Sequence, residues 1–333
     1  MFKVAINGLG RIGRATLKIV LDNPELELVA VNDLVPPDNL AYLLKYDTVY
    51  GKYEKSVEVE GNSLLIGGKK IPVFSSKDPS ELPWGKLGVD TVFECTGKLT
   101  GKADMQKHIN AGAKSVILST TSKEEEVGTV VVGVNTIDPN SKLISCASCT
   151  TNCITPVVEI MGRRIGIEKA ILTTVHSYTS TQSIVDSPSK KFRRGRAGAM
   201  NLVPTSTGAA IATTRALPQY KGKFDGVAVR APVADGSLSD ITFITSRPTT
   251  VEEIRNIFRE EASSPRYKNI IGVSEDPLVS SDIIKDPHAS VVDLELVQVV
   301  DGNLVKIMSW YDNEWGYASQ MVREAENLSK SRK

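Results

Sequence analysis

A glycine-rich turn near the start of the chain is the feature that most constrains its fold. Residues 8–13 read Gly-Leu-Gly-Arg-Ile-Gly, directly after the apolar run 4–7 and at the opening of a helical pattern over 11–21. Glycines at such a junction allow a tight turn in which strand and helix approach closely. The pattern predicts that the chain begins with a strand, a turn and a helix of a parallel sheet.

The same alternation continues to about residue 148. Short β-branched runs predict strands at 4–7, 26–32, 90–94, 115–119, 129–134 and 143–145. Helical patterns lie at 11–21, 38–45 and 102–111, and residues 56–74 indicate strands joined by glycine-rich turns. We therefore expect an α/β fold with a doubly wound, mainly parallel dinucleotide-binding sheet.

The second part of the chain has a different pattern. Longer runs with period-two character occupy 170–176, 224–233, 238–245, 290–300 and 304–310, as in antiparallel strands with one covered face. Residues 250–253 read Thr-Val-Glu-Glu, a capping box that opens an amphipathic helix over 251–262. A last helix is expected after Gly316. This part predicts a separate α+β domain with a mainly antiparallel sheet.

Length and charge exclude several classes of protein. The 333 residues are enough for two domains with separate cores, and the formal net charge is only +1. Near-neutrality makes nucleic acid an improbable primary partner, and the absence of an apolar run of about 18 residues argues against a membrane span. The first residues lack the pattern of a secretory signal, so we expect a cytoplasmic protein.

An acidic residue after the second predicted strand supports a dinucleotide site at the glycine turn. Asp33 lies 20 residues beyond Gly13, where a carboxylate can accept hydrogen bonds from the adenosine ribose hydroxyls. The free amides and the positive end of the following helix would meet a pyrophosphate. Because the carboxylate would repel a 2′-phosphate, the sequence predicts NAD as the cofactor, with NADP as a secondary possibility.

Three of the four cysteines lie within residues 145–153, which read Ser-Cys-Ala-Ser-Cys-Thr-Thr-Asn-Cys. A metal site would need about four ligands, and the only histidines, at 108, 176 and 288, are scattered, so no metal is predicted. Cys146 and Cys149 have the spacing of a redox pair, although nothing else indicates a thioredoxin-type unit. The third interpretation is favoured: Cys149 begins a helix whose free amides stabilise a thiolate nucleophile.

A nucleophilic cysteine requires a base. His176 ends a predicted strand, whereas His108 lies in a polar helix and His288 in a loop after a proline. His176 is therefore the predicted base. Cys153, one helical turn beyond Cys149, is predicted to be a small buried side chain.

These residues together resemble the phosphorylating glyceraldehyde-3-phosphate dehydrogenase family over nearly the whole chain. The stretches that carry the resemblance are Asn-Gly-Leu-Gly-Arg-Ile-Gly-Arg (7–14), Ala-Ser-Cys-Thr-Thr-Asn-Cys (147–153), His-Ser-Tyr-Thr (176–179), Pro-Thr-Ser-Thr-Gly-Ala-Ala (204–210) and Trp-Tyr-Asp-Asn-Glu-Trp-Gly-Tyr (310–317). The resemblance implies an NAD-binding domain over 1–148, joined by a C-terminal helix over 314–333, and a catalytic domain over 149–313. It also implies a cytoplasmic homotetramer.

The resemblance also implies the chemistry. Cys149 would attack glyceraldehyde 3-phosphate and His176 would take the proton, giving a thiohemiacetal and then a thioester that inorganic phosphate cleaves to 1,3-bisphosphoglycerate. The implied contacts to the substrate phosphate are Thr179, Thr181, Lys191 and Arg230. Those to the attacking phosphate are Ser148, Thr150, Arg196, Thr207 and Gly208. The implied cofactor contacts are Asn7, Gly8, Gly10, Arg11, Ile12, Gly13, Asp33, Lys77, Thr96, Gly97, Ser119, Asn313 and Tyr317.

Alternatives remain at this point. A related dehydrogenase of the same fold, acting on erythrose 4-phosphate, would share the cysteine and the histidine. A binding module that retains the dinucleotide fold could use the basic run 190–196 to contact RNA, although overall neutrality makes this the weaker hypothesis. Cys146 stands where the family usually has Asn, and either fills space or resolves an oxidised Cys149 as a disulfide.

Overall fold

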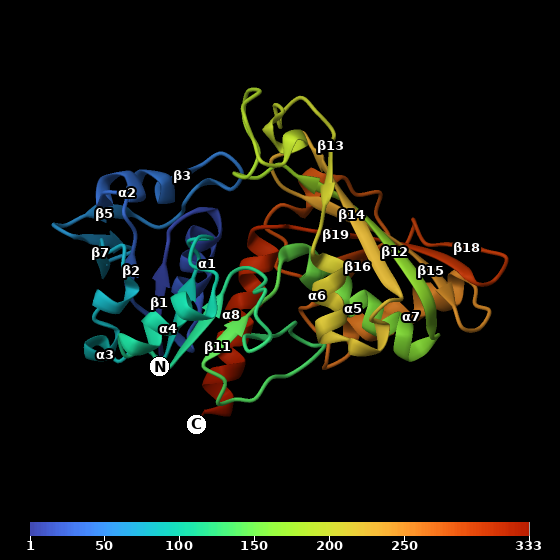
Figure 1. The fold of residues 1–333 in the computed structure, drawn as a ribbon, viewed down its shortest axis with the longest axis horizontal. Helices are drawn as coiled ribbons and strands as arrows, with labels where there is room; N and C mark the ends of the chain where they lie inside the picture. The colour runs from blue at the N-terminus through green and yellow to red at the C-terminus, as the bar shows by residue number, and fades with distance from the viewer. Residues whose placement is uncertain (333) are drawn as a thin grey trace. The chain divides into compact units, whose positions relative to one another are not determined.

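The computed structural model describes residues 1–332, which divide into two compact units (Figure 1). The first unit comprises Met1–Val130, Ile137–Ala147 and Ala318–Lys333, and the second comprises Val131–Thr136 and Ser148–Tyr317. The division follows the change of pattern seen in the sequence, since the first unit carries the alternating strands and helices.

The first unit is built on a nine-stranded sheet in the order β10-β11-β9-β8-β1-β2-β7-β6-β5. Its strands are β1 (Phe2–Asn7), β2 (Leu26–Asn32), β5 (Val57–Val59), β6 (Ser63–Ile66), β7 (Lys69–Phe74), β8 (Thr91–Glu94), β9 (Ser115–Leu118), β10 (Gly128–Thr129) and β11 (Leu143–Ser145). The pairings from β10 through β7 are parallel, and β5, β6 and β7 form an antiparallel edge. The predicted doubly wound, mainly parallel sheet is confirmed.

Five helices and a small hairpin complete this part of the chain. The helices are α1 (Arg11–Asp22), α2 (Pro37–Lys45), α3 (Trp84–Leu87), α4 (Lys102–Asn110) and α8 (Trp315–Ser331), and the hairpin is β3 (Tyr46–Asp47) with β4 (Gly51–Lys52). One 3₁₀ turn, η1, spans Pro79–Glu81. Within residues 1–332, no helix combines the length and the apolar character needed to cross a membrane.

The second unit contains a mixed sheet in the order β13-β14-β12-β15-β19-β17-β16, with β18 paired to β19. Its strands are β12 (Ile167–Ser177), β13 (Val203–Ser206), β14 (Phe224–Ala231), β15 (Ser237–Thr245), β16 (Ile271–Ser274), β17 (Ser290–Asp293), β18 (Gln298–Val300) and β19 (Leu304–Tyr311). Most pairings are antiparallel, as predicted. The pairs β12–β14 and β16–β17 are parallel, which strand periodicity alone could not reveal.

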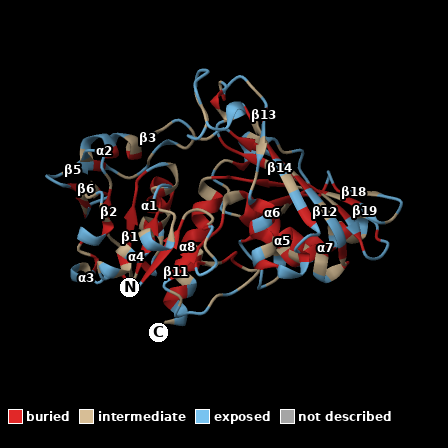
Figure 2. Ribbon diagram, viewed as in Figure 1, coloured by how far each residue is buried: buried red, intermediate tan, exposed pale blue. Residues whose placement is uncertain are grey.

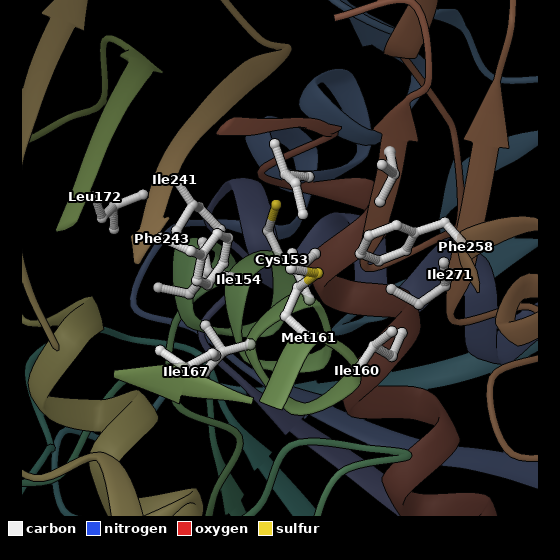
Figure 3. Close-up of a cluster of buried hydrophobic side chains, with 14 of the residues drawn as sticks. Cys153, Ile154, Ile160, Met161, Ile167, Leu172, Ile241, Phe243, Phe258 and Ile271 are labelled. Carbon is white, nitrogen blue, oxygen red and sulfur yellow. The ribbon is translucent and has the colours of Figure 1, made fainter. Parts of the chain in front are cut away.

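Helices α5 (Cys149–Arg164), α6 (Ala209–Ala216) and α7 (Val251–Ser263) pack on this sheet, and short 3₁₀ turns lie at η2 (Phe192–Gly195), η3 (Pro218–Tyr220) and η4 (Ser280–Ile283). Helix α5 contacts β12, β15, β17 and β19, and its residues 150–158 are all buried (Figure 2). Cys153, Ile154 and Met161 from α5 meet Phe243 and Phe258 in the core (Figure 3). This packing holds the start of α5, and therefore Cys149, in a rigid position.

Three local predictions are corrected. The strand expected over 129–134 is reduced to β10, because the chain turns at 131, where the Asn135 side chain accepts a hydrogen bond from the Val131 amide. The strand expected over 290–300 breaks into β17 and β18, because the Asp293 carboxylate accepts from the amides of Glu295 and Leu296 and forms a turn.

The predicted capping box at α7 is only half formed. The Thr250 hydroxyl accepts from the Glu253 amide at 3.2 Å, as expected. The Glu253 carboxylate, however, binds Arg247 and the Thr249 hydroxyl, both at 2.7 Å, in place of the Thr250 amide. A charged partner within reach outcompetes the backbone donor.

A buried acid on α8 yields a prediction about pH and stability. Glu324 is 4 % exposed, and burial raises its pKa from 4.5 to about 7, although Asn327 and Arg332 partly oppose the shift. The folded protein therefore binds more protons than the unfolded chain between these values. The stability that the protonated Glu324 side chain provides is fully present below pH 4.5 and is lost as the pH rises through 7.

We predict that Glu324→Gln, which removes the ionisation but keeps the shape, makes the protein more stable at pH 8 by on the order of 2 kcal/mol and leaves it little changed at pH 5. Urea unfolding at the two pH values measures the difference. An equal effect of the substitution at both would contradict the assigned protonation.

Candidate active site

The first unit contains a pocket of about 540 Å³ at the carboxyl ends of β1, β2 and β8. This is the edge at which parallel α/β sheets bind ligands. The lining residues are Asn7, Gly8, Gly10, Asn32, Asp33, Leu34, Val35, Ser76, Lys77, Cys95, Thr96, Lys98 and Leu99. The volume and the mixed polar and apolar lining suit a nucleotide.

Two glycines of the turn are required by space. Gly8 has φ +91°, and a Cβ there would lie 2.8 Å from the Thr96 nitrogen, while a Cβ on Gly13 would lie 1.9 Å from the Gly8 oxygen. Helix α1 begins after Gly10, which has no side chain to occupy the helix start. The chain therefore presents bare backbone amides and a helix N-terminus to the pocket, which suits a pyrophosphate.

Asp33 is held in place at the end of β2. Its Oδ2 accepts from the Leu9 amide at 2.6 Å and its Oδ1 from the Val35 amide at 2.9 Å. The carboxylate thus ties the glycine turn to β2 while its remaining lone pairs face the pocket. This arrangement suits two ribose hydroxyls and disfavours a 2′-phosphate.

Only some of the remaining predicted cofactor residues line the pocket. Asn7, Lys77 and Thr96 line the pocket, and Gly97 follows with φ +66°. The Arg11 side chain pairs with Asp47 at 2.6 Å. Ile12 and Ser119 do not line the pocket, and the Ser119 hydroxyl hydrogen-bonds Cys95.

The second unit brings the predicted nucleophile and base together. Cys149 is the first residue of α5, and the N-cap Ser148 hydroxyl accepts from the Thr151 amide at 3.2 Å. His176 lies near the end of β12 and is 4 % exposed. Cys149 Sγ lies 3.3 Å from His176 Nε2, close enough for proton transfer.

Arg230 completes this group from the neighbouring strand. It is the register partner of His176 in the parallel pair β12–β14. Its Nη1 lies 2.7 Å from His176 Nδ1 and 2.9 Å from the Ser177 carbonyl oxygen. Its Nε is buried and has no hydrogen-bond partner within residues 1–332. A half-buried guanidinium with a vacant donor favours an anionic ligand.

The Arg230 contact determines the resting tautomer of His176. Nδ1 also lies 2.8 Å from the Ser177 oxygen, but it cannot donate there and accept from Arg230 at the same time. Because a guanidinium only donates, Nδ1 accepts and the ring proton lies on Nε2, facing the sulfur.

Burial and the charge of Arg230 lower the pKa of His176 to about 3. Burial also raises the pKa of Cys149, and Arg230 and the Thr150 amide only partly oppose this. The sequence predicts a thiolate stabilised by the helix start. Burial acts against that stabilisation and favours the uncharged forms of both side chains.

Two of the predicted substrate-phosphate residues, Thr179 and Thr181, lie beside Arg194. The hydroxyls of Thr179 and Thr181 lie 2.9 Å apart, and Arg194 donates to Thr181 at 3.3 Å and to Thr205 at 3.0 Å. Lys191 is exposed and its Nζ lies 3.3 Å from the Ser206 hydroxyl.

Arg196 does not join this group. Its side chain is exposed and pairs with Asp186 at 2.7 Å. Arg194 pairs with no carboxylate in the described chain and adds positive charge near His176 and Arg230. The sequence did not distinguish them, since both lie in one basic run.

The other predicted phosphate residues offer mostly backbone donors. The Thr150 hydroxyl is buried against the Tyr311 hydroxyl at 2.9 Å, and its amide is directed at Cys149. Thr207 accepts from the Ala209 amide at 3.1 Å, and exposed Gly208 is the N-cap of α6. The start of α6 therefore leaves amides available to an anion.

Asn313 is oriented by two serines. Its Oδ1 accepts from Ser177 Oγ at 2.9 Å and from Ser237 Oγ at 2.7 Å, which leaves the amide nitrogen as the group that can meet a ligand. Tyr317 is buried in the same unit.

The two other cysteines of the cluster are buried. Cys146 belongs to the first unit, where burial raises its pKa and its neighbouring ionisable groups are Glu324 and Cys95. Cys153 is fully buried between Ser290 and Ser309. Among residues 1–332, no cluster of three or more histidine, cysteine or acidic side chains could hold a metal ion.

A dinucleotide-type pocket in one unit, and a cysteine–histidine pair beside two arginines without a carboxylate partner among the described residues in the other, fit the class of NAD-dependent oxidoreductases. Sequence comparison gives the family. Residues 2–102 match the glyceraldehyde 3-phosphate dehydrogenase NAD binding domain, and residues 148–313 match the C-terminal domain of the same family. The chain belongs to the glyceraldehyde 3-phosphate dehydrogenase family.

Relatives match over almost their full length. The chain is 46 % identical over 331 residues to glyceraldehyde-3-phosphate dehydrogenase 1 of Bacillus subtilis, covering 98 % of each chain. It is 44 % identical over 333 residues to glyceraldehyde-3-phosphate dehydrogenase of Zymomonas mobilis, covering 99 % of each. It is 45 % identical over 336 residues to the Borreliella burgdorferi protein of that name, covering 98 % of this chain and 100 % of the relative.

Proposed function

We propose that this enzyme oxidises glyceraldehyde 3-phosphate with NAD and inorganic phosphate to 1,3-bisphosphoglycerate, the phosphorylating oxidation of glycolysis. The observation that carries the proposal is the 3.3 Å contact between Cys149 and His176, with Arg230 on the far side of the ring. Relatives of nearly equal length are named for this activity. No observation on the described residues favours erythrose 4-phosphate.

Substrate binding prepares the nucleophile. The phosphate group of the aldehyde binds Arg230, whose vacant Nε and shared Nη1 suit two phosphate oxygens, with the hydroxyls of Thr179 and Thr181 and with Lys191 nearby. Withdrawal of Arg230 from Nδ1 lets Nδ1 bind a proton and donate it to the Ser177 oxygen. Nε2 then gives up its proton to solvent and can accept one from Cys149.

The thiol then adds to the aldehyde carbon, and its proton passes to Nε2 of His176. The thiohemiacetal forms on Cys149, where the backbone amide at the start of α5 and His176 stabilise the developing oxyanion. The protonated His176 gives this proton to the oxyanion, which becomes the hydroxyl of the thiohemiacetal, and takes it back as the thiohemiacetal is oxidised by two electrons to the thioester. NAD, when bound, supplies the electron acceptor.

Inorganic phosphate cleaves the thioester. Ser148, Thr207, Gly208, the Thr150 amide and Arg194 are the proposed donors that hold it for attack on the acyl carbon. The new carbon–oxygen bond replaces the carbon–sulfur bond, and Cys149 leaves and recovers its proton. Asn313, oriented by its two serines, would hold the carboxamide of the cofactor.

The assembly and location are also proposals. Side chains alternate between the two faces of a sheet, and the strand register therefore puts four residues on one face of the second sheet: Ile171, Val175, Val227 and Ile244. All four are exposed. Figure 2 shows such exposed stretches along β12 and β14. An apolar face of this kind indicates a subunit interface. We infer a homotetramer in the cytoplasm.

Cys149→Ser is expected to reduce dehydrogenase turnover at least about a thousandfold while NAD binding persists, because a hydroxyl does not supply an anionic nucleophile. Cys153→Ser, one turn further along α5 and remote from the reaction, is the matched control and should keep activity. Steady-state assays and calorimetric NAD titration measure both. Similar turnover in the two variants would remove Cys149 from its role.

Arg230→Leu tests recognition of the substrate phosphate. We expect kcat/KM for glyceraldehyde 3-phosphate to fall roughly a hundredfold, the effect of losing charge-assisted hydrogen bonds. The value for unphosphorylated glyceraldehyde should fall much less, because that aldehyde offers Arg230 no anion. Equal losses with the two aldehydes would instead assign Arg230 to maintaining His176.

The subunit interface can be tested by sedimentation velocity. Val175→Glu should yield smaller species than the parent tetramer, since it places a charge in the apolar face. Val279→Glu, at an exposed loop position away from that face, is the control. A monomeric parent, or a Val175→Glu tetramer, would contradict the assembly.

A further inference from the structure

A buried line of side-chain hydrogen bonds runs beneath the nucleotide pocket of the first unit. Trp84 Nε1 donates to His108 Nδ1 at 3.0 Å, and His108 Nε2 lies 3.1 Å from Glu94 Oε2. From the opposite side, Asn7 Nδ2 donates to the same Glu94 oxygen at 2.6 Å. Trp84, His108 and Glu94 are each 0 % exposed, and none of them belongs to the pocket lining.

The line continues to the pocket surface. Asn32 Nδ2 donates to Asn7 Oδ1 at 2.7 Å and to the Ser76 carbonyl at 3.0 Å, and Asn32 Oδ1 accepts from the Ser76 amide at 2.9 Å. The other Glu94 oxygen accepts from the Thr96 amide at 2.8 Å and from the Thr96 hydroxyl. Asn7, Asn32, Ser76 and Thr96 all line the pocket.

The donor and the acceptor of each hydrogen bond in this line are determined by the groups at its two ends, the Trp84 indole and the Ser76 amide. The indole N–H of Trp84 can only donate, so His108 Nδ1 accepts and its Nε2 carries the proton toward Glu94. The Ser76 amide can also only donate, which orients Asn32, then Asn7, so that Asn7 donates toward Glu94 as well. Donors that converge from both ends must meet at a group that only accepts, and an ionised carboxylate is such a group.

We propose that Glu94 is a positioning residue for the cofactor, the acceptor on which the Asn7, Asn32, Ser76 and Thr96 surface of the NAD pocket is oriented. The inference rests on the proposed NAD-dependent activity and assigns to Glu94 no contact with the cofactor.

Thr96 extends this effect to a second loop. Its hydroxyl hydrogen is used by Glu94, and its oxygen accepts from the amides of Lys98 and Leu99 at 3.2 and 3.3 Å. Lys98 and Leu99 also line the pocket. Glu94 therefore holds both the segment after β1 and the segment after β8.

An isosteric amide at position 94 cannot satisfy this network. A nitrogen in place of Oε1 would face the Thr96 amide, which only donates. A nitrogen in place of Oε2 would face Asn7 and His108. Flipping the Asn7 and Asn32 amides moves the conflict to the Ser76 amide, and changing the His108 tautomer moves it to the Trp84 indole. Every rearrangement leaves two donors in contact.

The test is NAD titration and full kinetics on the intact chain. Glu94→Gln should raise both the Kd and the KM for NAD at least about tenfold, the order expected of one buried polar mismatch, while kcat at saturating NAD and the KM for the aldehyde stay within twofold. Thr91→Val is the matched control, because Thr91 lies on the same strand as Glu94 but away from the pocket, and the substitution removes its buried hydrogen bond to Ser115 on β9. It should lower the melting temperature without changing NAD affinity.

Two substitutions of His108, which does not line the pocket, keep the proposal testable if Glu94→Gln does not fold. His108→Gln retains an acceptor for Trp84 and a donor for Glu94, so NAD affinity should stay within twofold of the parent. His108→Leu retains neither and should weaken NAD binding severalfold. NAD affinity unchanged in both Glu94→Gln and His108→Leu, or reduced equally in Thr91→Val, would overturn the inference. A parent that binds no NAD would instead refute the proposed function.

Discussion

The contact between Cys149 and His176 depends on a helix that begins and a strand that ends at one edge of the same sheet. Ser148 starts α5 as its N-cap, the apolar face of α5 packs on the sheet, and β12 carries His176 to within 3.3 Å of the sulfur. Arg230 follows from register, because the parallel pairing of β12 with β14 sets it beside the imidazole. The reactive group is therefore positioned by backbone geometry and core packing, which keep its parts from drifting apart.

Two buried polar arrangements work in contrasting ways. Around Glu94 every donor meets an acceptor and the direction of each bond is determined, so that part of the molecule is rigid. Around His176 one nitrogen has two competing partners, and Arg230 keeps a donor without a partner in the described chain. The incomplete network lies where an anionic substrate is proposed to bind. It allows binding to change the protonation of the nucleophile, whereas the complete one maintains the shape of a pocket.

Sequence patterns predicted the parallel sheet, the glycine turn and the location of Cys149, because each depends on local periodicity or on a residue that only one conformation accepts. They did not predict the parallel pairing of β12 and β14, which joins segments far apart in the chain, or the break at Asp293, which a single side chain causes. The ion pair between Arg196 and Asp186 was also not predicted, because only the folded loop brings the two side chains together. The sequence placed Glu94 in a predicted strand. Its proposed role in positioning the pocket residues depends on four hydrogen-bond donors that only the folded chain brings to its carboxylate. Long-range polar contacts thus account for most of what the sequence left open.

The central claim is that Cys149 carries the acyl group and that phosphate releases it. Peptide mass spectrometry after mixing the enzyme with glyceraldehyde 3-phosphate and NAD in phosphate-free buffer tests it most directly. The account predicts a 3-phosphoglyceroyl thioester on the peptide that contains Cys149, and its disappearance as 1,3-bisphosphoglycerate forms when phosphate is added. An adduct on another residue, or product formation with no acylated Cys149 on the way, would contradict it.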